Sequence, residues 1–116
     1  MLLRVSGKAT GEDLEIGVVT GREAGDGGVA HGAALVTYAE SVMGDDDTVL
    51  AKSRQALLER IGPEGLVDAA AVIAGFNVVD RIADATGIPL DEGMDMATAK
   101  MRERIGIDAF APEKSR

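Results

Sequence analysis

The chain contains no cysteine, and this absence removes several chemistries at once. Disulfides, thiolate metal sites, a cysteine nucleophile and a dithiol redox pair all require the thiol side chain. Aromatic residues are also scarce, because Tyr38, Phe76 and Phe110 are the whole set. The apolar mass is therefore carried by alanine, valine, leucine, isoleucine and methionine, a composition that suits closely packed helices.

Positive charge and long hydrophobic runs are in short supply as well. The 12 Lys and Arg residues stand against 20 Asp and Glu, which gives a formal net charge of −8. Such an acidic surface repels phosphate backbones and anionic lipid, so we expect no nucleic acid and no membrane as partner. The longest uncharged run of the apolar region, Ala69 to Val79, is 11 residues against the roughly 20 of a bilayer-spanning helix. With no signal-peptide pattern at the N-terminus, we expect a cytoplasmic protein.

Glycine, in contrast, is abundant at the start of the chain. Eight of the 15 glycines lie at or before residue 32, and each interior glycine costs a helix about 1 kcal/mol relative to alanine. We therefore predict a glycine-rich N-terminal arm over residues 1–32 and one helical domain over residues 33–116. Within the arm, Leu2–Val5 and Leu14–Val19 could pair as a short β-hairpin, because the second run alternates as a half-buried strand does. An irregular arm that docks on a partner subunit fits these residues equally well.

Helical periodicity and end signals predict an all-α fold after residue 32. We expect a small domain of about four helices, at residues 34–43, 47–61, 63–86 and 95–105. A glycine follows each predicted helix, as is common at helix C-termini: Gly44, Gly62, Gly87 and Gly106. The third predicted helix is the longest, at roughly 35 Å, and forms the centre of the domain.

Two loop motifs have a functional and a structural interpretation. The acidic run Asp45–Asp47 is interpreted as a helix cap, since the calcium-loop motif requires glycine where Leu50 stands. The run Gly25–Ala30 fits a dinucleotide-binding pattern, but Asp26 would repel phosphate and no clear strand leads into it. We interpret it as a flexible hinge, and we expect no cofactor and no metal ion.

The candidate catalytic residues are His31, Arg81 and Asp84. His31 is the only histidine, and an imidazole near neutral pK is suited to proton transfer, although a surface or capping role fits it as well. Asn77, Asp80, Arg81 and Asp84 are spaced three or four residues apart on the third predicted helix, so their side chains can meet. We interpret these four as a structural polar network that satisfies a buried guanidinium, with a ligand-binding role and a solvated face as alternatives.

The same residues carry a resemblance to a known family. The segment "LVDAAAVIAGFNVVDRIADATGIPLDEG", residues 66–93, is similar to the C-terminal helix of the carboxymuconolactone decarboxylase and alkylhydroperoxidase-D-like superfamily. The resemblance is carried by the Phe76-Asn77 pair, the Asp80-Arg81 pair and the exit over residues 87–90. Residues 34–62 resemble the two helices that precede it in peroxidase-related members. The likeness covers roughly residues 33–93.

The resemblance implies an all-helical fold that assembles into homo-oligomers. It also implies, in the peroxidase branch, activity from a Cys-x-x-Cys pair with a nearby histidine and glutamate, and none of these catalytic residues can be placed in this chain. We therefore expect a non-catalytic, homo-oligomeric member that lacks the redox cysteines, or one that works with a separate catalytic subunit. The alternative is a thiol-free enzyme of the decarboxylase or isomerase type, in which His31 or Asp84 moves a proton and Arg81 holds a small carboxylate substrate.

Overall fold

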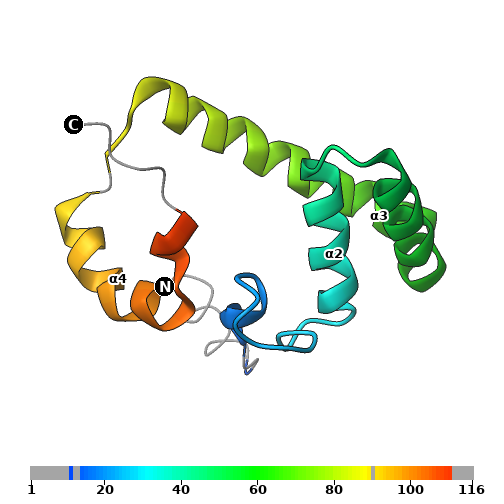
Figure 1. Cartoon of the computed structure of the whole chain (residues 1–116), viewed down its shortest axis with the longest axis horizontal. Helices are drawn as coiled ribbons and strands as arrows, with labels where there is room; N and C mark the ends of the chain where they lie inside the picture. The colour runs from blue at the N-terminus through cyan, green and yellow to red at the C-terminus, as the bar shows by residue number, and fades with distance from the viewer. Residues whose placement is uncertain (1–10, 12–13, 90, 111–116) are drawn as a thin grey trace. The chain divides into compact units, whose positions relative to one another are not determined.

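The computed structural model of the chain describes residues 11, 14–89 and 91–110, and over these residues it is helical and contains no strand (Figure 1). The prediction of an all-α fold is confirmed. Its elements are two short 3₁₀ turns and three α-helices: η1 (Ile16–Val18), α2 (Gly32–Met43), α3 (Asp47–Thr86), α4 (Glu92–Ile105) and η2 (Ile107–Phe110).

The described residues form two compact units. One unit is His31–Pro89 and contains α2 and α3. The other joins the described residues before His31 to those from Asp91 onward, so that η1, α4 and η2 belong together. Each unit has its own small core and is described by itself.

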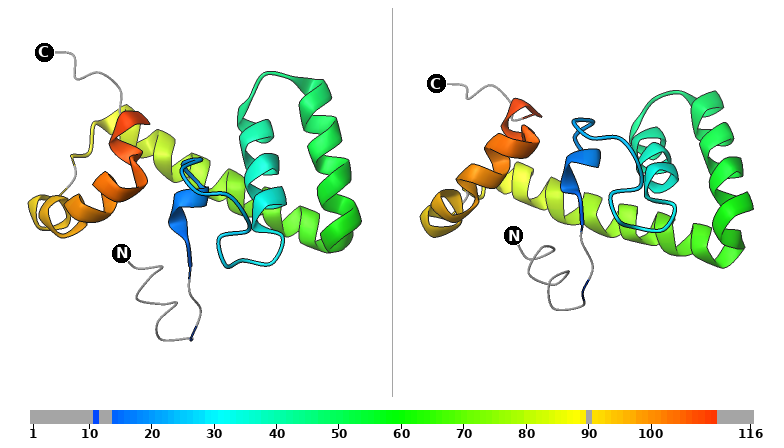
Figure 2. Two further views of the ribbon diagram at one scale, coloured as in Figure 1. Left: turned by 60° about the horizontal axis from the view of Figure 1, so that its bottom comes forward. Right: turned by 90° about the horizontal axis from the view of Figure 1, so that it is seen from below.

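In the first unit, α2 packs against α3 (Figure 2). Two apolar side chains are buried there, Leu57 with 0% and Tyr38 with 6% of its surface exposed. Beside them, the hydroxyl groups of Ser41 and Ser53 are 2.5 Å apart and join the two helices. The α2–α3 contact therefore has a very small fully buried centre, with one leucine, one tyrosine and a pair of serines.

The predicted count of four helices is wrong, because the second and third predicted helices continue as one element, α3. Gly62 alone departs from helical geometry within it, with φ 75° and ψ 175°, and Pro63 follows directly. A positive φ of this kind is open to glycine at little cost, so a single residue is enough to redirect the chain. Figure 2 shows the ribbon of α3 changing direction between its two parts. We call residues 63–86 the second part of α3.

The helix ends follow the capping chemistry of the sequence. Asp46 accepts hydrogen bonds from the backbone N–H groups of Thr48 (2.8 Å) and Val49 (3.1 Å), as the cap interpretation of the acidic run expects. α4 begins at Glu92, earlier than the predicted residue 95, because Asp91 caps the N–H groups of Gly93 and Met94. α3 ends with Gly87 in the left-handed conformation at φ 65°.

The predicted β-hairpin is wrong at its second strand. Within Leu14–Val19 the residues Ile16–Val18 form the 3₁₀ turn η1, while the first predicted strand, Leu2–Val5, lies outside the described residues. The carbonyl of Gly17 accepts hydrogen bonds from the backbone N–H groups of Arg22 and Glu23. The chain therefore forms a local turn at Gly17. The hydrogen bonds of this turn outweigh the strand preference of the short alternating run.

The second unit is held together by two arginines. Arg102 of α4 pairs with Asp95 (Nη2–Oδ1, 2.6 Å) and with Asp108 (Nε–Oδ1, 3.1 Å), so it ties α4 to η2. Arg22 donates through Nη1 to the carbonyls of Glu103 (3.5 Å) and Arg104 (3.2 Å) at the end of α4. A cation at this end of a helix interacts favourably with the helix dipole and the free carbonyls.

Gly106→Ala is expected to destabilise this unit by more than Gly87→Ala destabilises the other. Both glycines have a left-handed φ, 69° and 65°, so alanine costs about 1–2 kcal/mol at either position. At Gly106 a Cβ atom would overlap the guanidinium of Arg22, whereas at Gly87 it would meet nothing within 4 Å.

The measurement is urea denaturation of the two variants followed by far-UV circular dichroism. The added loss at Gly106 reflects the displacement of Arg22 from the end of α4, so combining Gly106→Ala with Arg22→Ala should add little. Equal losses at the two glycines would show that Arg22 is not held against α4 in solution.

Candidate functional site

His31 lies at the start of α2 with an exposed side chain. It is the N-cap residue, its side chain makes no capping hydrogen bond, and its backbone is left-handed with φ 61° and ψ 22°. Among the described residues it is the only non-glycine residue with positive φ. Such a conformation costs roughly 1–2 kcal/mol outside glycine, so the backbone here is strained.

Asn77, Asp80, Arg81 and Asp84 all lie on the second part of α3. Asn77 is partly buried, and its side-chain amide donates to the sulfur of Met43 on α2. The other three side chains are exposed, and among the described residues no ion pair or hydrogen bond joins these four side chains to one another. The physical reason is solvation, since an exposed guanidinium is satisfied by water and gains little from a surface partner. The polar network therefore stays a prediction.

Arg81→Ala is expected to change the free energy of unfolding by less than about 0.5 kcal/mol, because the side chain is exposed and has no bonded partner among the described residues. The matched change Arg102→Ala should cost at least about 1 kcal/mol, because it removes bonds to Asp95, Asp108 and Thr98. Urea denaturation measures both. A loss of more than about 1 kcal/mol for Arg81→Ala would mean that the polar network forms in solution.

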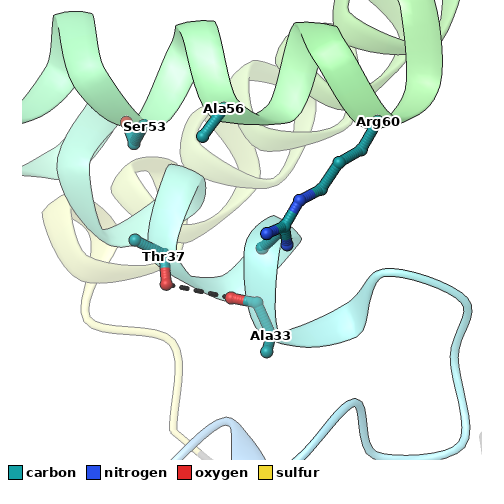
Figure 3. A pocket seen from close by; sticks show the side chains of 6 residues that line it. Ala33, Thr37, Ser53, Ala56 and Arg60 are labelled. Atoms are coloured by element: carbon teal, nitrogen blue, oxygen red, sulfur yellow. Dashed lines mark hydrogen bonds between the residues drawn. The ribbon is translucent and has the colours of Figure 1, made fainter.

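A hollow in the first unit lies between α2 and the first part of α3, residues 47–61. Its volume is about 230 Å³. Six residues line it: Ala33, Ala34, Thr37, Ser53, Ala56 and Arg60. Figure 3 shows Arg60 reaching from α3 toward Ala33 near the start of α2. His31, Arg81 and Asp84 are not among the lining residues.

The lining offers one cation and two hydroxyl groups. Thr37 Oγ1 donates to the carbonyl of Ala33 at 2.9 Å (Figure 3), and Ser53 Oγ donates to the carbonyl of Leu50 at 3.0 Å. A nucleophilic hydroxyl needs a neighbouring base, and neither of these is paired with one. The hollow is therefore suited to holding a small anion at Arg60, whose side chain is itself exposed.

The largest apolar feature is the surface of the second part of α3. Six of its apolar side chains are each more than half exposed: Val67, Val72, Phe76, Val78, Val79 and Ile82. They spread over about half of the circumference of the helix, while the other half carries the exposed residues Asp80, Arg81 and Asp84, so the segment presents one broad apolar face. Phe76, with 67% of its surface exposed, is the largest of them.

In the described ranges, no group of three or more His, Asp or Glu side chains is placed to hold a metal ion. None of the helices described is long and apolar enough to cross a membrane.

No protein-family model matches this chain, and comparisons with curated proteins and with solved structures found no match either. The resemblance of residues 33–93 to the carboxymuconolactone decarboxylase and alkylhydroperoxidase-D-like superfamily stays a prediction. The functional proposal therefore rests mainly on the exposed apolar surface of α3.

Proposed function

We propose that this chain is a non-catalytic, homo-oligomeric assembly module whose contact surface is the second part of α3. We further propose that it is a divergent member of the carboxymuconolactone decarboxylase and alkylhydroperoxidase-D-like superfamily without the redox cysteines. The resemblance of residues 66–93 supports this assignment. The observation that carries the oligomer is the set of six exposed apolar side chains on this helix.

The magnitudes allow self-association. Full burial of one valine, isoleucine or phenylalanine side chain contributes about 1.5–3 kcal/mol, so covering the exposed part of each contributes about 1–2 kcal/mol. A single helix contact covers one side of α3, where Val72, Phe76 and Val79 lie, so two copies supply roughly 6–12 kcal/mol against an association cost of roughly 4–15 kcal/mol. Within the first unit only Leu57 and Tyr38 are buried apolar side chains, so such a contact would add substantially to its stability.

The hollow at Arg60 supports the non-catalytic part of the proposal. Its lining combines alanines and hydroxyl groups with one arginine, and the candidate acid–base residues His31 and Asp84 lie elsewhere. A thiol-free enzyme acting on a small carboxylate would need a base beside the bound substrate. Calorimetric titration with acetate and malonate separates the non-catalytic module from the thiol-free enzyme. For the non-catalytic module we expect no binding that depends on His31 or Arg81.

The test of the proposal is the molar mass of the chain in solution, measured by light scattering coupled to size-exclusion chromatography over a range of concentrations. We expect the mass of an oligomer, which is two or more times the chain mass of 12.0 kDa. A stable monomer at micromolar concentration would contradict the proposal.

A further inference from the structure

One stripe of the second part of α3 has the spacing of a helix-packing seam. Ala69, Val72, Phe76, Val79 and Ala83 follow one another at steps of three, four, three and four residues. At about 100° per residue all five lie within about 40° of a single line along the helix. This alternation is the a/d pattern of helices that pack side by side over several turns. We call these five residues the seam.

The seam is not the side of α3 that faces α2. The partly buried residues Leu66, Ala70, Ile73 and Asn77 form a separate stripe, about 100° around the helix, and Asn77 contacts Met43 of α2. At the centre of the seam, Val72, Phe76 and Val79 are 59%, 67% and 63% exposed, while Ala69 and Ala83 at its ends are partly buried. The centre of the seam is therefore an apolar stripe with the spacing of a helix contact that α2 leaves uncovered.

We propose that the occupant of the seam is the seam of a second copy, with the two α3 helices antiparallel and Phe76 beside the two-fold axis. This inference rests on the proposed function and names its contact. A helix that packs along the seam must present the same spacing, and α3 does so. The side chains also run from small to large to small, as Ala, Val, Phe, Val, Ala, so the stripe complements itself when reversed.

The antiparallel direction is favoured by the helix dipoles. In a parallel pair the two dipoles would be aligned, whereas in an antiparallel pair they oppose each other. In the antiparallel pair, Val72 lies opposite Val79 of the second copy, and Ala69 lies opposite Ala83 of the second copy.

Gly75 is a second observation that points to a close neighbour. It lies in the middle of α3, where glycine destabilises a helix relative to alanine. A Cβ atom added there would meet nothing within 4 Å, so no described part of this chain requires glycine at this position. In the antiparallel pair it leaves space next to the axis for the ring of Phe76 from the second copy.

The absence of cysteine makes the arrangement directly testable by disulfide mapping in the full chain. Ala69→Cys and Ala83→Cys are each oxidised alone and as an equal mixture, with one variant tagged to separate the products by mass. Alone, neither should form a disulfide dimer, because a residue and its own copy would be about 21 Å apart along the antiparallel helices. The mixture should form the mixed disulfide.

Val72→Cys and Val79→Cys form a second pair with the same expectation, which keeps the test decisive if one of the first variants does not fold. Ala74→Cys is the matched control, because this exposed residue lies on the side of α3 opposite the seam. It should give no disulfide alone or in any mixture.

Each other outcome overturns the inference. Efficient disulfides from the single variants Ala69→Cys or Ala83→Cys would show a parallel pair. An oligomer by mass with no disulfide in any mixture would show that another surface, or another protein, forms the contact, while the proposed function would stand. A monomer in which Phe76→Cys reacts slowly with maleimide would show that the chain covers the seam itself, and both proposals would fall.

Discussion

Phe76→Glu is expected to convert the assembled chain into monomers. Phe76 is the largest exposed apolar side chain of α3, and the two-fold arrangement buries it in both copies. Loss of a buried phenylalanine costs about 3–5 kcal/mol, and an unpaired carboxylate at the same place adds to that. Even about 3 kcal/mol corresponds to at least a hundredfold weaker association. Sedimentation equilibrium measures the change in dissociation constant.

Val49→Glu is the matched control for this change. Val49 is also an exposed apolar residue of α3, with 47% of its surface exposed. It lies in the first turn of the helix, outside the second part of α3. A glutamate is well tolerated near a helix N-terminus, so we expect both association and fold to be unchanged. Equal association of Phe76→Glu and the unaltered chain would contradict the account of the contact.

Leu57→Ala is expected to lower the free energy of unfolding of the His31–Pro89 unit by about 2–5 kcal/mol, because it leaves a cavity in a very small core. Leu57 is the only fully buried side chain among the described residues, with 0% of its surface exposed. For a unit of this size, such a loss is a large part of the total stability. Urea denaturation followed by far-UV circular dichroism measures it.

Leu58→Ala makes the same chemical change one residue away, where the side chain is only partly buried. It should cost clearly less, since fewer neighbours lose contact with it. If the two variants unfold at the same urea concentration, the α2–α3 contact does not provide the core of this unit.

The parts of the fold that the sequence predicted are those that depend on local chemistry. Gly87 and Gly106 end their helices because a left-handed residue closes a helix, and Asp46 begins α3 because its carboxylate satisfies free N–H groups. The count of helices was wrong at Gly62, where one non-helical residue redirects the chain without separating two elements. The hairpin failed because the alternation in Leu14–Val19 is too short to outweigh a local turn.

The site was less predictable, because it depends on which side chains remain exposed. Spacing placed Arg81 near Asp84 in sequence, but spacing alone does not show whether a guanidinium is buried and needs a partner. Half of the residues that line the hollow at Arg60 are alanines, which carry no functional signal in a sequence. The run around Phe76 was recognised as apolar, yet only the structure shows that α2 leaves one stripe of it uncovered.

The solution mass of the full chain tests the central claim most directly. Light scattering during size-exclusion chromatography, repeated over a range of concentrations, gives the mass of the unaltered chain and of Phe76→Glu side by side. The account predicts a multiple of 12.0 kDa for the first and a mass near 12.0 kDa for the second. A mass of 12.0 kDa for the unaltered chain at micromolar concentration and above would contradict it.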